Sequence, residues 1–305
     1  MKYSVVIVTY NRLELLKECL EHVLKQSLPF DVVYVINNNS TDGTTEYLQK
    51  LSQTNKTVIT FNTGMNLGGA GGFSYGLSKI DARTDYVLII DDDAIIDLDF
   101  IENIDKNIRP EIQAYSGTVY RDGKIDTSHR RIISNRILLS KMDIPAESYE
   151  QTVFDIDIAT FCGLMVSTKL VNTIGLPMKE YFIWYDDTEY SLRIRKHTRI
   201  LNVSAARINH KVKSTVGTRQ SWKSFYGYRN MWDMGMKYST IPALFTVYKS
   251  LFHHFKRIQN TIKFFLSKDI YYSNISTLHK DVLVAHQKKV LGFNSKYSYT
   301  TDLTK

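Results

Sequence analysis

Three adjacent carboxylates, Asp91, Asp92 and Asp93, stand between two apolar runs in the segment DYVLIIDDDAII (85–96). Like charges this close repel one another, and the apolar neighbours indicate a partly buried place where solvent screens the repulsion poorly. A solvated acidic turn is one explanation, and a positive group among the carboxylates is the other. Because side chains alternate along an extended chain, we expect Asp91 and Asp93 on one side and Asp92 on the other.

Two carboxylates on one side can share a divalent cation, and oxygen ligands select Mg²⁺ or Mn²⁺ over Zn²⁺. Such ions commonly take substrate phosphates as further ligands, so Asp91 and Asp93 predict a phosphorylated substrate of the nucleotide type. His210 ends the strand-like segment RILNVSAARINH (199–210), which would return its imidazole to the same place. A lone histidine is more often structural, but here it would complete an Asp, Asp, His ligand set.

A second acidic cluster lies in FIWYDDTEYSLRIR (182–195), where carboxylates stand beside Trp184 and Tyr185 at the start of a predicted helix. Acids in a first helical turn complement the helix dipole, and this accounts for at least one of Asp186, Asp187 and Glu189. Aromatic rings can cover the apolar faces of a sugar while carboxylates accept its hydroxyl hydrogens. A carboxylate placed in this way can also act as a general base.

The glycine-rich segment NLGGAGG (66–72) precedes a predicted helix. Glycines allow a close approach between backbone and ligand, and a helix N-terminus favours anions. The segment is not a dinucleotide fingerprint, because Ser74 stands where the third glycine of that pattern belongs, and it lacks the Gly-Lys-Ser/Thr of a P-loop. A flexible turn is the alternative interpretation.

Short β-branched runs alternate with helical patterns in the first half of the chain, which predicts a mostly parallel sheet with right-handed crossovers. All the motifs above then follow strand carboxyl ends, where sheets of this kind bind ligands. The predicted strands are 4–9, 32–36, 57–62, 85–91 and 155–167, with a hairpin at 116–126. The predicted helices are 12–26, a second one in STDGTTEYLQKL capped by Ser40 or Thr41, and a third one after the glycine run.

The charge is distributed unevenly along the 305 residues, although the net charge is only +8. From Arg195 onward there are 20 Lys and Arg against 4 acids, and before it 19 against 27. The acidic part argues against a nucleic-acid ligand, whereas the basic part suits an anionic surface such as lipid headgroups. The two cysteines form no disulfide framework, and the sequence shows no secretion signal or membrane span, so we expect a cytoplasmic protein.

The basic tail contains a predicted amphipathic helix from Leu244 to Leu266. Such a helix can lie in a membrane interface, but packing on the domain or against another copy of the chain would need the same apolar stripe. We expect a domain over 1–215 and a helical extension over 216–305. The stripe consists of Tyr248, Leu251, Phe252, Phe255, Ile258, Ile262 and Phe265.

Taken together and in this order, SVVIVTYNR, NNNSTDGT, NLGGAGG, IIDDDA, WYDDTEYSLR and INH resemble glycosyltransferase family 2 over residues 1–210. Within that family, NLGGAGG and WYDDTE followed by a distal histidine most resemble bacterial galactofuranosyltransferases, and next rhamnosyltransferases of surface polysaccharides. The resemblance implies an α/β fold of the GT-A type, which is a Rossmann-like, mostly parallel sheet flanked by helices, here with a C-terminal helical extension.

The resemblance also implies roles for individual residues. Asn37 and Asn38 stand where acids often contact the base, and because an amide both donates and accepts, uracil and thymine both stay open. Thr9, Tyr10, Arg12 and Asn38 would line the nucleoside and diphosphate site. Asp92 would touch the ribose or the donor sugar, and Asn66, Gly68 and Gly69 would lie against the donor. Asp91, Asp93 and His210 would hold Mn²⁺ or Mg²⁺, Asp187 would be the general base, and Trp184 and Asp186 would contact the acceptor.

The implied activity is metal-dependent, inverting sugar transfer in bacterial cell-envelope polysaccharide synthesis. The favoured donor is UDP-galactofuranose, the alternative donor is dTDP-rhamnose, and the acceptor is a hydroxyl of a glycan or lipid-linked precursor. The alternative from a different functional class is a non-catalytic scaffold protein that binds a nucleotide sugar. A nucleotidyltransferase would need a basic triphosphate-binding loop where the sequence offers only Arg12. We also expect contact with the inner face of the cell membrane and with further copies of the chain.

Overall fold

The computed structural model describes residues 1–211 and 219–304, which form two compact units. Among the described residues, the first unit contains 1–133, 141–179 and 187–211, and the second contains 134–140, 180–186 and 219–304. The predicted boundary between residues 215 and 216 lies outside the described residues.

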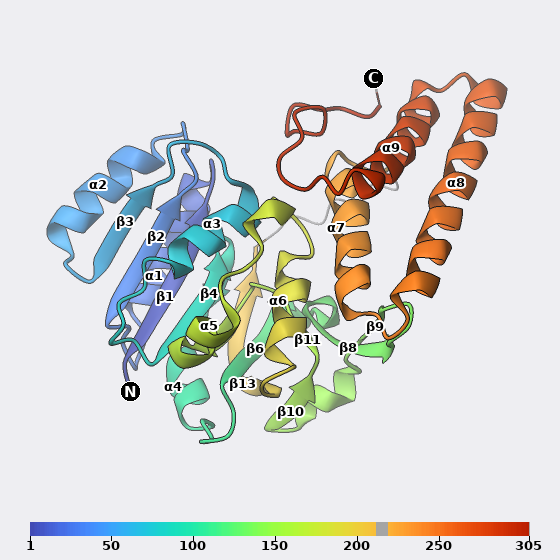
Figure 1. Cartoon of the computed structure of the whole chain (residues 1–305). Coiled ribbons are helices and arrows are strands. Elements are labelled where there is room, and N and C mark those ends of the chain that lie inside the picture. The colour runs from blue at the N-terminus through green and yellow to red at the C-terminus, as the bar shows by residue number, and fades with distance from the viewer. Residues whose placement is uncertain (212–218, 305) are drawn as a thin grey trace. The chain divides into compact units, whose positions relative to one another are not determined.

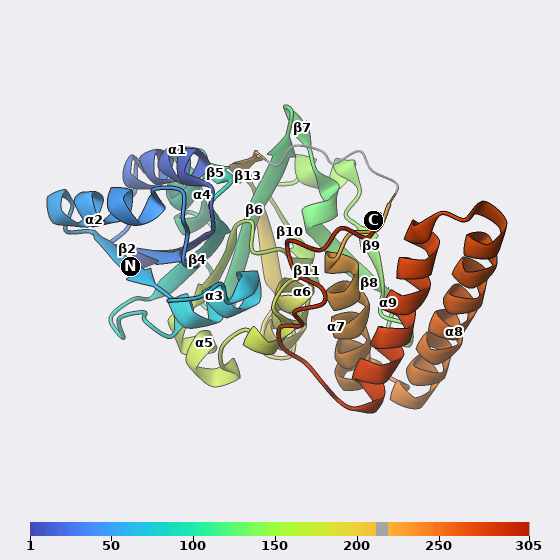
Figure 2. The ribbon, with the colours of Figure 1, turned by 90° about the horizontal axis from the view of Figure 1, so that it is seen from above.

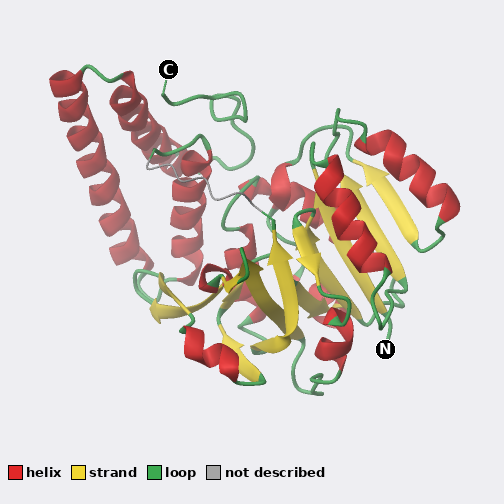
Figure 3. Ribbon diagram, turned by 180° about the vertical axis from the view of Figure 1, so that it is seen from behind, coloured by secondary structure: helices red, strands yellow, loops and turns green. Residues whose placement is uncertain are grey.

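A ten-stranded sheet forms the centre of the first unit in the described part of the chain (Figures 1 and 3). Its strands are β1 (Tyr3–Thr9), β2 (Val32–Asn37), β3 (Val58–Asn62), β4 (Tyr86–Asp91), β5 (Ala94–Ile96), β6 (Ala114–Arg121), β7 (Lys124–Ile125), β10 (Val153–Ile156), β12 (Leu164–Ser167) and β13 (Ile200–His210). The order is β10-β13-β6-β12-β4-β1-β2-β3, with β5 paired to β13 and β7 to β6. A small second sheet contains β8 (Arg130–Asn135), β9 (Ser140–Asp143) and β11 (Ile158–Ala159).

The first four strands are parallel, as predicted, whereas β12 runs antiparallel to both β4 and β6. The predicted hairpin at 116–126 is confirmed by the antiparallel pairing of β6 with β7. Strand β1 is buried along its whole length because helices cover both faces of the sheet. Val5 and Ile7 join the core on one face, and Val6 and Val8 join the core on the other.

Helices lie on both faces of this sheet (Figure 2). One face is covered by α1 (Leu13–Leu24), α2 (Thr44–Thr54) and α4 (Phe100–Asp105), and the other by α3 (Gly68–Leu77), α5 (Thr168–Ile174) and α6 (Asp186–Ile194). The predicted cap of α2 is wrong: the helix begins at Thr44 after Gly43, whose φ of 89° favours glycine. Asp42 accepts bonds from the Thr44 backbone N–H and hydroxyl at this helix start.

The glycine run is part of a helix and does not precede one, which corrects the sequence-based prediction. Close packing of α3 on the sheet requires it: a Cβ at Gly72 would lie 2.6 Å from Val8 Cγ1, and a Cβ at Gly76 would lie 2.5 Å from Val6 Cγ1. This packing outweighs the poor helix propensity of glycine. Gly69 differs, because a Cβ there would meet no atom within 4 Å.

The second unit contains three long helices, α7 (Lys223–Tyr238), α8 (Pro242–Ser267) and α9 (Ile270–Gln287). Helix α8 includes the whole predicted amphipathic segment and packs against α7 and α9. Among the described residues, no helix has both the length and the apolar character that crossing a membrane requires. Short 3₁₀ helices occur at Thr127–His129, Ala146–Glu150 and Lys179–Tyr181.

We predict that Gly72→Ala destabilises the protein by about 1–3 kcal/mol, because the stiff Val8 side chain must move to admit the new methyl group. Gly69→Ala is the matched control in the same helix, and it should be neutral or stabilising by up to about 1 kcal/mol. Urea denaturation followed by far-ultraviolet circular dichroism measures both changes. Equal stability of the two variants would contradict the packing explanation.

Candidate functional site

The carboxyl ends of three neighbouring strands bring the sequence motifs together. Strand β1 lies between β4 and β2, and its last residues pair as Val8 with Asp91 and Thr9 with Asn37. The segment TYNR, the NNNSTD loop and the aspartate triplet therefore leave the sheet side by side. This is the sheet edge at which the sequence predicts a ligand.

Arg12 is the positive group among the three carboxylates. Its Nη1 lies 3.2 Å from Asp92 Oδ1 and also contacts Asp93. Thr9 Oγ1 donates to Asp92 Oδ2 over 2.7 Å. The prediction that Asp92 points away from Asp93 is wrong, because both carboxylates contact the same guanidinium. The strand β4 ends at Asp91, and the next two residues form a turn in which side chains do not alternate. Asp91 is partly exposed at the strand end.

The pKa values of the two inner carboxyl groups shift in opposite directions, although Asp92 is 3% and Asp93 2% exposed and burial opposes the ionisation of both. Loss of solvent raises the pKa of Asp92 to about 6, against the opposing effect of Arg12. Burial also opposes ionisation of Asp93, but His210 and Arg12 outweigh it and lower the pKa of that carboxyl. Asp93 is therefore held as a carboxylate.

His210 reaches Asp93 because β13 pairs with β5, placing His210 opposite Ala94. The Lys211 N–H donates to the Asp93 carbonyl over 2.9 Å and fixes this register. His210 Nε2 lies 3.4 Å from Asp93 Oδ1. Asp93 Oδ1 and His210 Nδ1 are buried and have no hydrogen-bond partner among the residues that the structure describes. A carboxylate oxygen and an imidazole nitrogen so placed fit a divalent cation.

His129 and Cys162 also lie beside His210, and the sequence analysis missed both. The two imidazole rings are edge-to-face with centroids 4.8 Å apart, and the ligand atoms of the three residues lie within 4.8 Å of one another. His129 Nδ1 is 2.7 Å from Thr160 Oγ1, and burial lowers the pKa of His129. Neither His129 nor Cys162 is spaced from another possible ligand as in a known metal-binding motif, so the sequence does not indicate their role.

The loops after β2 and β3 support each other through amide side chains. Asn38 Nδ2 donates to the Gly68 carbonyl over 2.9 Å, and Asn66 Oδ1 accepts from the Gly68 N–H over 2.8 Å. Gly68 has a φ of 72°, which explains a glycine there. Asn37 bonds the Ser40 N–H and the Thr45 hydroxyl. Both adjacent asparagines are thus engaged within the protein. Tyr10, which directly follows β1, is partly exposed.

The acidic cluster of 182–195 divides into residues with different surroundings. Glu189 is 2% exposed and pairs with Arg193 over 2.8 Å, so it has a structural role. Asp187, in the first unit, is partly exposed, and its Oδ1 accepts from the N–H and hydroxyl of Thr188. Asp186 and Trp184 belong to the second unit, where Asp186 is buried and the Trp184 side chain is 45% exposed.

Trp184 sits in a strained backbone segment that Asn230 holds in place. Phe182, Trp184 and Tyr185 have φ values of 65°, 66° and 70°, which are rare for bulky residues. Asn230 Nδ2 donates to the carbonyls of Tyr181, Ile183 and Trp184 at 2.9, 3.0 and 2.8 Å. The motif FYGYRN (225–230) therefore supports the chain around Trp184.

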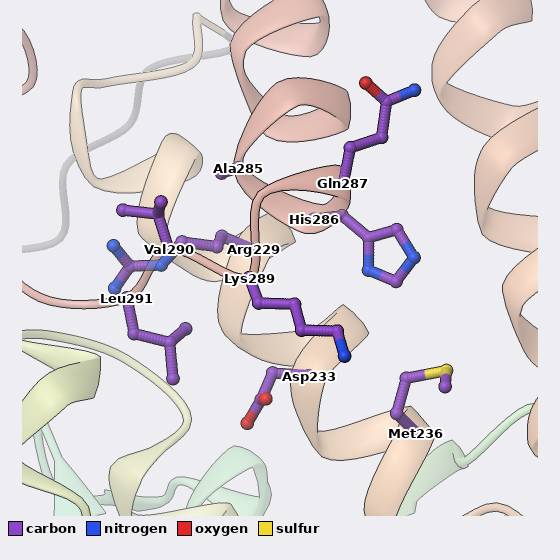
Figure 4. Close-up of a pocket in the computed structure, with 9 residues that line it drawn as sticks. All are labelled: Arg229, Asp233, Met236, Ala285, His286, Gln287, Lys289, Val290 and Leu291. Carbon is purple, nitrogen blue, oxygen red and sulfur yellow. The ribbon is translucent and has the colours of Figure 1, made fainter.

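Arg229 of the same motif also binds backbone, with Nη1 donating to the Gly292 carbonyl over 2.6 Å and Nη2 to the Glu180 carbonyl over 3.2 Å. It lines a cavity of about 410 Å³ within the second unit together with Asp233, Met236, Ala285, His286, Gln287, Lys289, Val290 and Leu291 (Figure 4). The two backbone carbonyls hold the Arg229 side chain in the wall of this cavity.

A helix-flanked, mostly parallel sheet with an aspartate triplet at its carboxyl edge defines the GT-A class of fold. Residues 4–168, just over half of the chain, match the family described as Glycosyl transferase family 2. The chain belongs to glycosyl transferase family 2. The resemblance noted in the sequence is thereby confirmed at the level of the family and the fold.

Individual relatives are distant. The chain is 26% identical to the dTDP-rhamnosyl transferase RfbF of Shigella flexneri over 202 residues, or 65% of this chain and 64% of that protein. It is 24% identical to the poly(ribitol-phosphate) beta-glucosyltransferase of Bacillus spizizenii over 177 residues, or 57% of this chain. The match spans only 24% of that relative's length.

A crystal structure of GalNAc-T7 with UDP, GalNAc and Mn²⁺ has the same fold, with a TM-score of 0.63 and 15% identity. The match covers 77% of this chain and 47% of that chain. At this identity the likeness concerns the fold alone.

We predict that Asn230→Ala destabilises the second unit by at least about 2 kcal/mol, because three carbonyls of a strained segment lose their donor. Gln287→Ala removes an exposed amide from the same unit and should change stability by less than about 0.5 kcal/mol. The three tryptophans, Trp184, Trp222 and Trp232, all lie in this unit, so urea unfolding followed by their fluorescence reports on it. Equal unfolding midpoints for the two variants would refute the supporting role.

Proposed function

We propose that this protein is a metal-dependent, inverting glycosyltransferase that moves a hexose from a nucleotide sugar to an acceptor hydroxyl. The observation that carries the proposal is the pair Asp93 Oδ1 and His210 Nε2, which lie 3.4 Å apart beside the Asp92–Arg12 contact. Asp93 is a carboxylate kept ionised, and its buried Oδ1 lacks a hydrogen-bond partner within the described ranges 1–211 and 219–304, which suits a cation-binding role.

Asp91, Asp93 and His210 are the proposed ligands of Mn²⁺ or Mg²⁺, and a cation there would stabilise the negative charge that develops on the leaving diphosphate. Arg12 supplies a second positive charge for the diphosphate, and Thr9 and Tyr10 are the proposed neighbours of the nucleoside. Asn66, Gly68, Gly69 and Asp92 are the proposed donor-side residues. Asn38 is also a proposed neighbour of the nucleoside diphosphate, and its amide in addition supports the Gly68 backbone.

Asp187 is the proposed general base. Its carboxylate takes the proton from the acceptor hydroxyl as the oxygen bonds to the anomeric carbon, while the bond from that carbon to the diphosphate oxygen breaks on the opposite face. This single displacement inverts the configuration. Asp187 is partly exposed and so open to an acceptor. Trp184 and Asp186 remain the proposed acceptor contacts.

The donor proposed first is UDP-galactofuranose, because NLGGAGG, WYDDTE and the distal His210 resemble galactofuranosyltransferases. The likeness to RfbF, named as a dTDP-rhamnosyl transferase, supports dTDP-rhamnose as the second candidate. The acceptor class is a glycan or a lipid-linked precursor of the bacterial cell envelope. Donor hydrolysis with Mn²⁺ and a panel of UDP-sugars and dTDP-rhamnose distinguishes the donors. Binding of a donor with no turnover on any acceptor would favour a non-catalytic scaffold.

We predict that Asp187→Asn lowers the turnover number by about 10²–10⁴-fold while UDP binding in the presence of Mn²⁺ stays unchanged, because the base acts only on the acceptor proton. Asp186→Asn is the matched neighbour and should raise the acceptor KM with a smaller loss of turnover. Steady-state transfer assays and calorimetric UDP titrations separate the two effects. An Asp187→Asn variant that loses UDP binding and transfer equally would reject this division of roles.

A further inference from the structure

The outward face of α8 is apolar along nearly the whole helix. Each large apolar residue on this outward face is at least 42% exposed. A single exposed apolar residue is common on protein surfaces. A continuous row of this length marks an interaction surface. The row consists of Leu244, Val247, Tyr248, Leu251, Phe255, Ile258, Ile262, Phe265 and Leu266.

The opposite side of α8 already holds the helix in its unit. Phe245, His253 and Asn260 are buried there. His253 Nδ1 lies 2.8 Å from Nδ1 of His279 on α9, and its ring packs edge-to-face on Tyr228 of α7. The fold of the second unit therefore does not need the outward row, which stays available for a partner.

The charges of α8 are all positive. Its 26 residues contain no aspartate or glutamate, and Lys268 follows as the C-cap. Lys263 and Lys268 are exposed and Lys256 and Arg257 are partly exposed, whereas Lys249 is buried against α7. Lys256 Nζ lies 6.0 Å from the ring centroid of Phe252, and Lys268 Nζ lies 5.6 Å from that of Phe265. Cationic side chains that run beside aromatic rings can keep their charges at a headgroup layer while the rings enter it.

A second copy of the chain is the rival occupant of this face. The spacing 244, 248, 251, 255, 258, 262, 265 has the four–three repeat of a coiled-coil seam. However, α8 offers no acid to pair with the bases of a second α8, so two copies would set like charges against each other. Val247 and Leu266 also widen the row beyond a narrow seam. Anionic lipid supplies the charge that another α8 lacks.

We propose that α8 docks on a bilayer containing anionic phospholipid, with Leu251, Phe255 and Ile258 at the centre of the inserted face. The helix lies in the headgroup region, parallel to the surface, and the exposed Lys263 and Lys268 contact the lipid phosphates. This surface goes beyond the proposed sugar transfer and does not depend on which donor is used.

The test is sedimentation of the full chain with vesicles of equimolar phosphatidylglycerol and phosphatidylcholine, compared with pure phosphatidylcholine. The wild type should bind the anionic vesicles selectively, and salt should weaken binding. The variant Leu251→Gln/Phe255→Gln/Ile258→Gln keeps the charge and should bind at least about a hundredfold more weakly. Circular dichroism checks that it folds. The matched control exchanges exposed apolar residues of the first unit, Met65→Gln/Leu98→Gln/Met142→Gln, and should bind like the wild type.

A charge variant, Lys263→Gln/Lys268→Gln, should bind the anionic vesicles roughly tenfold more weakly. Wild-type protein that ignores the anionic vesicles, or binds both kinds equally, overturns the proposal. It is also overturned if the wild type is a dimer that fails to bind vesicles and the α8 triple variant is a monomer. That result would assign the face to a second copy of the chain.

Discussion

The structure of the first unit depends on one electrostatic constraint, which is that Asp92 and Asp93 are removed from solvent and need positive charge beside them. Arg12 meets both carboxylates, and His210 meets Asp93. Breaking such a buried arrangement by removing one partner costs far more than an exposed ion pair contributes. Strands β1, β4 and β13 bring these groups together: Arg12 follows β1, both aspartates follow β4, and His210 is the last residue of β13.

Much of this arrangement follows from sequence patterns. Apolar runs separated by helical periodicity predict β1 to β4, and parallel strands place all of their carboxyl ends at one edge. The same logic predicts that His210 returns to the aspartates, and the pairing of β13 with β5 places it there. A positive group beside the triplet is also predicted, although the sequence does not single out Arg12 for that contact.

Other features lie beyond sequence patterns because long-range packing decides them. The glycine run forms a helix since Val8 and Val6 leave no room for larger residues, and propensity alone argues against that. The rings of His129 and His210 are in contact although the two residues lie far apart in the sequence, and no local spacing predicts this contact. The left-handed backbone at Trp184 is held by Asn230, 46 residues further along the chain. Each depends on contacts between distant segments.

The central claim is that the aspartate site holds a divalent cation which in turn binds the diphosphate of a sugar nucleotide. The most direct test is calorimetric titration of UDP and dTDP into the wild type and into Asp93→Asn, each with and without Mn²⁺. We expect at least one of the two nucleotides to bind the wild type only when Mn²⁺ is present and to fail with Asp93→Asn. Wild-type protein that ignores both nucleotides with Mn²⁺, or an Asp93→Asn variant that binds as tightly as the wild type, would contradict the claim.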